Sequence, residues 1–502
     1  MPGQVFAVHA ACLRGVEAVP VTVEVTLGGG LPSIAIIGMP DSTVLDARGR
    51  IRGAMRSAGF EVPRQSITVN LAPGDMRKTG SGLDLPIVIA ILAISGQIPL
   101  NGLDDCLFVG ELTLDGSVSP VRGSIAYQVL ARDLNLRLIG APELAALSLP
   151  GCSYGMLVHI SRLRAGVDTA APSVVADVSA HERPLVELDF ADVVGQETAK
   201  RAMAVAAAGE LGMLMVGAPG SGKTMLAKRM TTILPKLSVD DQQEALCIHS
   251  VAGEDIEELL AGRRPFRSPH HSISVAGLVG GGRPVRPGEI SLAHGGVLFL
   301  DELAEFPAHV LQTLRQPMEE GCVRIVRVDG MYLFPASFQL LAASNPCPCG
   351  YLGDREVPCS CSATAIERYR AKLAGPLIDR IDIVIDVFRP DPELIIKGAE
   401  GLATRDLLEM VERGRAFRSH REHARRVGLM HGRSVLERTT DELAFDEEAS
   451  EALLDFSRRL HITGRGIKRL SRIARTIADI DERERVMRQH ILEAVMYRGG
   501  GV

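Results

Sequence analysis

The stretch that decides the fold is Gly217-Ala218-Pro219-Gly220-Ser221-Gly222-Lys223-Thr224, which matches the phosphate-loop pattern G-x-x-x-x-G-K-[ST]. Its glycines let the backbone turn tightly and direct successive N–H groups at phosphate oxygens. Lys223 is placed to reach the β- and γ-phosphates, and the Thr224 hydroxyl to bind Mg²⁺. The apolar run 214–216 predicts a strand before the loop, and 225–230 predicts a helix whose N-terminus favours an anion. Because strand, loop and helix follow in this order, we expect all eight residues to bind ATP with Mg²⁺, and we disfavour a glycine-rich turn without a ligand.

The composition excludes several classes of protein. The chain has 502 residues, enough for two to four domains, and its hydrophobic content of 46% can build real cores. Its net charge of −6 means that any nucleic-acid binding must use local basic loops. Nine cysteines in so long a chain do not indicate a secreted disulfide scaffold. With no signal-peptide pattern and no apolar run long enough to span a bilayer, we expect a soluble cytoplasmic protein without a membrane partner.

The pattern of elements predicts three parts and a linker. Residues 1–165 read as a mixed α/β domain, with strands at 19–27, 33–38, 66–71 and 107–112 and helices at 42–57 and 83–95. Residues 166–190 are small, polar and Pro-containing, which is typical of a linker. Strands and helices alternate over 191–390, which predicts a mostly parallel, doubly wound sheet around the phosphate loop. The remainder, 391–502, is charged and helical.

Polar residues at the ends of two apolar runs predict the rest of a nucleotide site. Asp301 and Glu302 end the strand-like run 297–302, and in a parallel sheet this end lies beside the phosphate loop. Asp301 is predicted to hold Mg²⁺ through water, and Glu302 to orient and activate the attacking water. Asn345 follows another apolar run and is predicted to position that water, although an ordinary turn Asn before Pro346 is an equal alternative.

Two arginines are candidates for contact with the γ-phosphate. Arg380 stands between Asp379 and Asp382, where a local salt bridge is the simpler interpretation. In a ring ATPase such an arginine reaches the neighbouring subunit's phosphate as an arginine finger. Arg465 precedes an expected helix at 467–480 and is a second candidate. On spacing alone, solvated arginines account for both.

The motifs VLFLDE, ASNPCPCGYLGD, GPLIDRIDI and RIARTIADI, together with the phosphate loop, resemble the magnesium-chelatase-like AAA+ proteins of the YifB/ComM group. The resemblance covers nearly the whole chain and implies a homo-hexameric ring with ATP sites between subunits. It assigns Lys223 and Thr224 to Walker A, Asp301 and Glu302 to Walker B, Asn345 to sensor 1, Arg380 to the finger in trans and Arg465 to sensor 2. The segment Gly464-Arg465-Gly466 departs from the usual sensor 2 pattern, which leaves Arg472 and Arg475 as rivals.

The same resemblance implies a DNA motor, a helicase that drives branch migration when incoming single strands recombine during natural transformation. Two insertions of the ATPase core support DNA contact: the basic, glycine-rich loop 263–287 and an expected β-hairpin at 323–333. Arg267, Arg324 and Arg327 are predicted to meet phosphates of single-stranded or branched DNA. Solvated surface loops are the plainer alternative, and the arginine-rich stretch 413–438 or the N-terminal domain are other candidates for DNA contact.

The N-terminal domain resembles the Lon-protease-like, ribosomal-S5-type fold. Ser81 lies near the place of a Lon nucleophile, but the nucleophile position itself falls on Gly82. Arg122 stands where a base is needed, and a guanidinium does not deprotonate. We therefore expect a non-proteolytic domain that binds DNA or a partner.

Four cysteines form a candidate metal site. Cys347, Cys349, Cys359 and Cys361 have the spacing C-x-C-x₉-C-x-C, and four thiolates so close suit tetrahedral Zn²⁺. The pairs are tighter than usual in zinc sites, so free, inert thiols remain the alternative.

Two other functions compete with the DNA motor. One is a chelatase-type motor that acts on a partner protein, and the other is a protein-remodelling chaperone, suggested by the Lon-like domain. Stimulation of ATP hydrolysis by single-stranded DNA is expected of the DNA motor and distinguishes it from these two functions.

Overall fold

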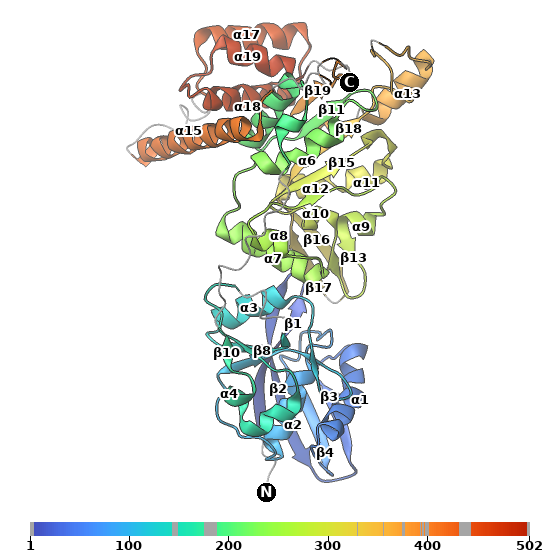
Figure 1. Ribbon diagram of the computed structural model, residues 1–502, viewed down its shortest axis with the longest axis vertical. Coiled ribbons are helices and arrows are strands. Elements are labelled where there is room, and N and C mark those ends of the chain that lie inside the picture. Colours follow the sequence, from blue (N-terminus) through green and yellow to red (C-terminus); the bar gives the residue numbers. More distant parts are fainter. Residues whose placement is uncertain are drawn as a thin grey trace.

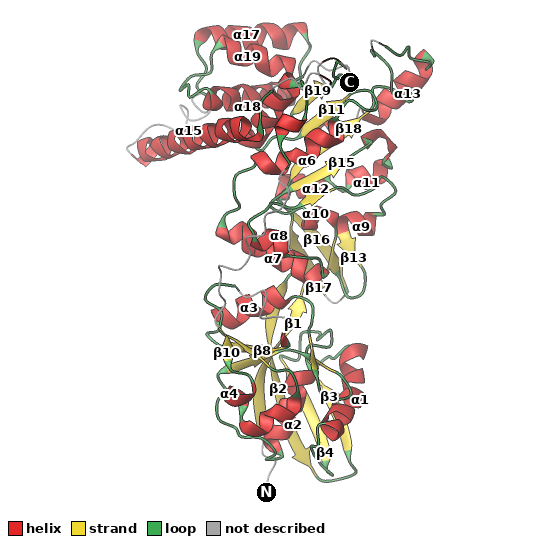
Figure 2. Cartoon of the chain, viewed as in Figure 1, coloured by secondary structure: helices red, strands yellow, loops and turns green. Residues whose placement is uncertain are grey.

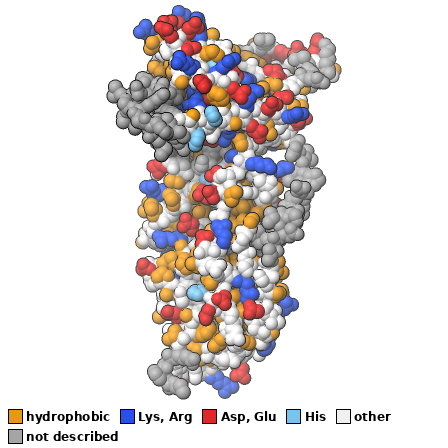
Figure 3. Space-filling model, turned by 90° about the vertical axis from the view of Figure 1, so that its left-hand side faces the viewer, with side chains coloured by type: hydrophobic (Ala, Val, Ile, Leu, Met, Phe, Trp, Pro, Cys, Tyr) orange, Lys and Arg blue, Asp and Glu red, His pale blue; other side chains and the backbone are white. Residues whose placement is uncertain are grey.

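The structure is a computed structural model, and it describes residues 5–142, 149–174, 188–328, 330–354, 356–373, 377–391, 393, 396, 401–430 and 443–498. The molecule is elongated: an N-terminal α/β unit lies at one end, a parallel sheet lies in the middle, and a group of helices lies at the other end (Figure 1). Basic, acidic and apolar side chains are intermixed over the face shown in Figure 3, as the small net charge leads one to expect. Among the described residues, no helix has the length and apolar character needed to cross a membrane.

The N-terminal unit is built on an eight-stranded sheet with the order β10-β9-β8-β5-β1-β2-β4-β3. Buried residues of the strands and of α2, whose residues 84–93 are all buried, form its core. Its elements are β1 (Val5–Arg14), β2 (Glu17–Gly28), β3 (Ser33–Ile37), α1 (Ser42–Ser57), β4 (Ser66–Ala72), α2 (Asp84–Ile94), β5 (Cys106–Phe108), β6 (Glu111–Leu112), β7 (Val118–Ser119), α3 (Ser124–Asp133), β8 (Arg137–Gly140), β9 (Tyr154–Met156), α4 (Val167–Ala170) and β10 (Ser173–Val174).

Most sequence-predicted elements of this unit are confirmed, and two regions differ. Helix α1 starts where expected because the Asp41 carboxylate accepts a hydrogen bond from the Val44 N–H. The expected strand 107–112 is two strands, since β5 joins the large sheet while β6 pairs with β7. Strand β1 was not predicted, yet it pairs with β2 along its whole length.

The predicted linker 166–190 begins with regular structure. Residues 167–170 form helix α4, and residues 173–174 form strand β10, which pairs with β9 at the edge of the large sheet. Residues 175–187 of the linker lie outside the described part of the chain.

The central unit holds a five-stranded sheet with the order β12-β15-β18-β11-β19, and every pairing in it is parallel. The parallel sheet predicted around the phosphate loop is therefore confirmed, with helices on both faces (Figure 2). Its elements are α5 (Glu197–Gly209), β11 (Met213–Val216), α6 (Lys223–Ile233), α7 (Val239–Ala252), α8 (Glu257–Leu260), β12 (Phe266–Arg267), α9 (Val275–Val279), β13 (Gly280–Gly281), β14 (Arg286–Pro287), α10 (Glu289–Leu292), β15 (Val297–Leu300), α11 (Ala308–Gln312), α12 (Arg315–Glu320), β16 (Cys322–Arg327), β17 (Gly330–Pro335), β18 (Gln339–Ser344), α13 (Ala363–Leu373) and β19 (Ile383–Asp386).

The C-terminal part is helical in its described residues, with α15 (Thr404–Met430), α17 (Glu447–Arg459), α18 (Gly464–Ile480) and α19 (Arg488–Met496). Helix α18 lays a buried apolar face on the core that α5 and α6 share with one side of the parallel sheet. It begins earlier than predicted: Thr463 caps it by accepting from the Gly466 N–H, so Arg465 lies within its first turn.

The N-terminal and central units meet where α3 faces α7 (Figure 1). The Gly123 N–H donates to the Ser250 carbonyl at 3.0 Å, and the Ser124 and Ser250 hydroxyls lie 3.1 Å apart. A small cluster of apolar side chains is also buried at this contact. Its members are Ile125, Leu149 and Cys152 of the N-terminal unit and Ala245, Leu246, Ile256 and Leu259 of the central unit. The two units therefore share buried apolar surface and backbone hydrogen bonds.

Candidate functional site

The phosphate loop joins β11 to α6 and needs its glycines. Gly220 and Gly222 have φ angles of 78° and 92°, a left-handed conformation that glycine adopts without a steric penalty. A Cβ at Gly217 would lie 2.1 Å from the Val387 carbonyl oxygen, so no side chain fits there. Helix α6 begins at Lys223, and this places its N-terminus at the loop.

Lys223 is bound by the loop itself: its ammonium donates to the Gly217 and Ala218 carbonyls at 2.7 and 3.0 Å. Burial lowers the pKa of Lys223, and the nearby carboxylates of Asp301 and Glu302 oppose that shift. The ammonium is thus held by the backbone of the loop that is predicted to bind phosphate.

The ends of three neighbouring strands bring the other predicted groups to this loop. The Thr224 hydroxyl donates to Asp301 Oδ2 at 2.9 Å, and Lys223 Nζ donates to Asn345 Oδ1 at 3.4 Å. Strands β11, β18 and β15 are adjacent and parallel, so the residues that follow them share one edge of the sheet. The structure therefore brings together Lys223, Thr224, Asp301 and Asn345, while their chemical roles stay predictions.

Glu302 lies at the same edge but faces a partner that the sequence did not indicate. Its φ angle is 51°, and its Oε2 lies 3.3 Å from His271 Nδ1. In the sequence, His271 is one residue of the basic loop 263–287, and no motif singles it out. The signal that could have found it is its position just after β12, the strand that pairs in parallel with β15.

The predicted finger arginine lies in a separate cluster. Arg380 ends a 3₁₀ turn, Ile378–Arg380, and its Nε donates to Glu319 Oε1 at 3.0 Å. The pKa of the Glu319 carboxyl is lowered chiefly by Arg380, and also by Arg315 and Arg465. Arg465 thus lies near Arg380. In the described part of the chain, no hydrogen bond or ion pair joins Arg465 to the phosphate loop.

The rival arginines of α18 have structural partners. Arg472 Nη1 lies 3.5 Å from Asp382 Oδ1. Arg475 is buried and donates to Asp479 Oδ1 at 3.1 Å and to the Glu484 carbonyl at 2.8 Å. Both rivals therefore have carboxylate partners in the fold, and the assignment of sensor 2 to Arg465 stays a prediction.

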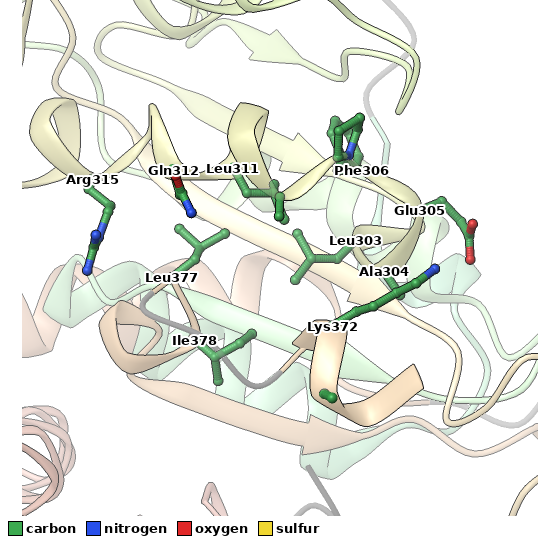
Figure 4. A pocket seen from close by; sticks show the side chains of 13 residues that line it. Leu303, Ala304, Glu305, Phe306, Leu311, Gln312, Arg315, Lys372, Leu377 and Ile378 are labelled. Atoms are coloured by element: carbon green, nitrogen blue, oxygen red, sulfur yellow. The ribbon is translucent and has the colours of Figure 1, made fainter. Parts of the chain in front are cut away.

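A mostly apolar cavity of about 430 Å³ lies between the residues that follow Glu302 and the turn that carries Arg380 (Figure 4). Leu303, Phe306 and Leu311 line one side, and Leu377 and Ile378 line the other. The cavity therefore lies between the segment that follows β15 and the turn that carries Arg380.

The three arginines predicted to bind DNA differ in their surroundings. Arg324 and Arg327 are exposed on the hairpin β16–β17, and the hairpin itself is confirmed. Arg267 instead makes a bidentate ion pair with Glu289, at 2.7 Å for both bonds, and also contacts Glu254 at 3.3 Å. Phosphate binding by Arg267 stays a prediction, and it would require the guanidinium to exchange these carboxylate partners.

Four sulfur atoms gather as the cysteine spacing predicts. The Sγ atoms of Cys347, Cys349 and Cys359 lie 3.4 to 3.7 Å apart, and all four Sγ atoms, with that of Cys361, lie within 4.8 Å of one another. Four sulfurs at about 2.3 Å from a tetrahedral Zn²⁺ would be about 3.8 Å apart, so the cluster fits this ion. The pKa of Cys349 is lowered to about 5 because the backbone N–H groups of Tyr351 and Ser360 donate to its sulfur, which favours the thiolate that metals bind.

The Lon-like positions of the N-terminal unit do not assemble a serine–base pair of the Lon kind. Ser81 Oγ donates to Glu111 Oε2 at 2.5 Å. A Cβ at Gly82 would lie 3.3 Å from the Val109 side chain, a tight contact, and glycine itself carries no nucleophile. Arg122 donates to the Ala252 carbonyl of the central unit at 3.0 Å, so this residue joins the two units.

Comparisons with known proteins identify the family of the chain. Residues 189–394 match the family described as magnesium chelatase, subunit ChlI, residues 23–143 match subunit ChlI of Mg-chelatase, and residues 401–498 match the ChlI C-terminal family.

The chain is 38% identical to YifB of Escherichia coli over 506 residues, which covers 98% of this chain and 96% of that protein. It is 37% identical to competence protein ComM of Haemophilus influenzae over 500 residues, 98% of this chain and 97% of ComM. A magnesium-chelatase 67 kDa subunit of Chlorobaculum parvum is 28% identical over 165 residues, 31% of this chain and 23% of that subunit. The chain belongs to the YifB/ComM family of magnesium-chelatase-like AAA+ proteins.

Proposed function

We propose that this member of the YifB/ComM family is a Mg²⁺-dependent ATPase that works as a homo-hexameric DNA motor, a helicase or translocase that drives branch migration during recombination. In this proposal residues 191–390 form the motor core, 1–165 a non-proteolytic Lon-like domain, and 391–502 a helical lid. Glu302 activates the attacking water, Asn345 positions it, and Asp301 and Thr224 hold Mg²⁺.

The proposed ring rests on one observation, which is that the predicted catalytic groups lie in two separate clusters. The groups that would bind and cleave ATP gather around the phosphate loop, whereas Arg380 and Arg465 lie around Glu319. Among the described residues, the contacts given for Arg380 and Arg465 place both around Glu319, so we infer that a neighbouring copy supplies them if they are to contact the γ-phosphate. Arg380 is then the finger, and Arg465 acts from the same side.

DNA as the substrate is supported by one relative and by one surface. The relative from Haemophilus influenzae is named a competence protein. The surface consists of the exposed arginines of the hairpins β16–β17 and β13–β14, Arg324 and Arg327 on the first, with Arg283 and Arg286 at the second. Cations on hairpins suit sequence-independent, salt-sensitive contact with phosphates.

The experiment for this proposal is ATP turnover with and without single-stranded DNA, at low and moderate salt. We expect hydrolysis that needs Mg²⁺ and rises with DNA, and a rise that shrinks with salt. Turnover that ignores DNA at low salt would favour the second candidate, a motor that acts on a partner protein. The match to part of a magnesium-chelatase subunit is the observation that favours this candidate.

We also propose that the four-cysteine cluster binds one Zn²⁺ as a structural ion. Cys347 and Cys349 directly follow Asn345 and Pro346 in the chain, so a bound ion would tie the segment that starts at sensor 1 into one rigid unit.

A further inference from the structure

We propose that Arg389 is a positioning residue that ties the phosphate loop to the four-cysteine segment, so that metal bound at the cysteines tightens the binding of ATP. The four-cysteine segment is defined here as residues 347–354 and 356–361. The inference deepens the proposed function and rests on it, since it assumes ATP at the phosphate loop and Zn²⁺ at the cysteines. It is based on three features of the described residues.

The first feature is that the four-cysteine segment packs directly on the phosphate loop. Gly350 has a φ angle of 86°, and its N–H closes a turn by donating to the Cys347 carbonyl at 3.0 Å. A Cβ built on Gly350 would lie 2.7 Å from Pro219 Cδ and 3.8 Å from Asn345 Cγ. The backbone of this turn therefore lies so close to the loop that any side chain at position 350 would displace the Pro219 ring.

The second feature is that Arg389 contacts the loop and the segment at once. It lies shortly after β19, the strand that pairs in parallel with β11. Its Nε donates to the Pro219 carbonyl at 3.3 Å, and its guanidinium carbon lies 5.4 Å from the centre of the Tyr351 ring. The same Nε lies 3.6 Å from Asp354 Oδ2. One guanidinium thus connects the backbone of the phosphate loop to two side chains of the four-cysteine segment.

The third feature is that both partners of Arg389 in the segment are held by the fold around the cysteines. The Tyr351 N–H donates to the Cys349 sulfur, and the Asp354 N–H donates to the Tyr351 carbonyl at 3.1 Å. The Asp354 side chain is 6% exposed, and its Oδ1 accepts from the N–H groups of residues 356 and 357, both at 2.9 Å. The positions of the Tyr351 ring and the Asp354 carboxylate therefore depend on the place of Cys349.

These contacts couple two binding sites. An ion that holds the four sulfur atoms in place also fixes the partners of Arg389, and with them the loop that is predicted to bind phosphate. The coupling is reciprocal, because a metal that tightens ATP binding must itself bind more tightly when ATP is present. A charge-assisted hydrogen bond and a cation–π contact at a partly exposed site correspond together to about a five- to tenfold change in a dissociation constant.

The test measures the Kd of fluorescent mant-ATP for the full chain, in the parent and in Arg389→Ala, each loaded with Zn²⁺ and after removal of zinc by a chelator and restoration of Mg²⁺. Removal of zinc should raise the Kd of the parent by about five- to tenfold. Arg389→Ala should raise it by a similar factor while the zinc content stays close to one per chain. Removal of zinc from Arg389→Ala should then change the Kd less than about twofold, because the connection is already lost.

Two further variants serve as controls. Arg370→Ala removes an exposed arginine of α13 that has no described contact with the phosphate loop, and it should bind mant-ATP like the parent. Arg389→Lys keeps the positive charge and a hydrogen-bond donor, so its Kd should lie between those of the parent and Arg389→Ala.

An Arg389→Ala protein that binds mant-ATP as tightly as the parent would overturn the inference. An equal loss of affinity in zinc-loaded and zinc-free protein would also overturn it, because Arg389 would then act on the nucleotide without the four-cysteine segment. A parent that takes up no zinc would refute the proposed ion and the metal coupling together, and the Kd of Arg389→Ala would still decide the tie to the loop. Because the assay contains no DNA, its result does not depend on the proposed DNA motor.

Discussion

Arg475 offers a sharp test of how the arginines of α18 divide their work. The Arg475→Ala change removes a buried guanidinium that donates to Asp479, to the Glu484 carbonyl and to the Leu443 carbonyl. Asp479 is also buried and would keep only Arg421, at 3.2 Å, among its described ion-pair partners. Breaking a buried charge pair typically costs about 3 to 5 kcal/mol, and the remaining Arg421 places the expected loss at the lower end, about 3 kcal/mol.

The assay is hydrogen exchange of the backbone amides of α18, because a chain of several units does not unfold in one step. A loss of about 3 kcal/mol should speed exchange through local opening by about two orders of magnitude. The matched control is Arg472→Ala, which removes a half-exposed partner of Asp382 and should change exchange less than about fivefold. If Arg475→Ala exchanges like the parent protein and yet stops ATP hydrolysis, Arg475 acts on the nucleotide and our assignment of Arg465 is wrong.

Three further predictions concern the nucleotide, the metal and the DNA. Glu302→Gln should bind ATP like the parent but hydrolyse it at least about a hundredfold more slowly, because an amide does not activate water; parental turnover would reject the role of Glu302. Protein purified without added zinc should contain close to one equivalent of zinc per chain by elemental analysis, and Cys347→Ser should lose it together with some stability; a metal-free, fully active parent would favour inert thiols. Arg327→Glu combined with Arg286→Glu should abolish DNA binding at low salt while DNA-free ATP hydrolysis persists; unchanged DNA binding would move the DNA site to another surface.

The parts that the sequence predicted well are those in which one local pattern is enough. The phosphate loop, the run 297–302 and the hairpin at 323–333 each have a signature within about ten residues, and each forms the expected element. The meeting of Thr224 with Asp301 followed from the parallel sheet, since the ends of parallel strands share an edge.

The parts that were missed depend on contacts between distant segments. His271 gains its partner only because β12 pairs with β15, and the two-residue β12 is too short to be read from a pattern. The ion pair of Arg267 with Glu289, which follows 22 residues later, likewise depends on the fold and has no local pattern in the sequence. Arg122 stood in a Lon-like position, and its carbonyl partner lies in the next unit of the chain.

The central claim is that two copies of the chain share each ATP site, and mixing two inactive variants tests it most directly. Lys223→Ala lacks the phosphate-binding ammonium, and Arg380→Ala lacks the finger while its own phosphate loop is intact. We expect each variant alone to hydrolyse almost no ATP in the presence of single-stranded DNA, and the equimolar mixture to regain measurable turnover at sites formed by an intact loop and an intact finger. No recovery in a mixture shown to form mixed assemblies, or parental turnover from a strictly monomeric chain, would contradict the shared site.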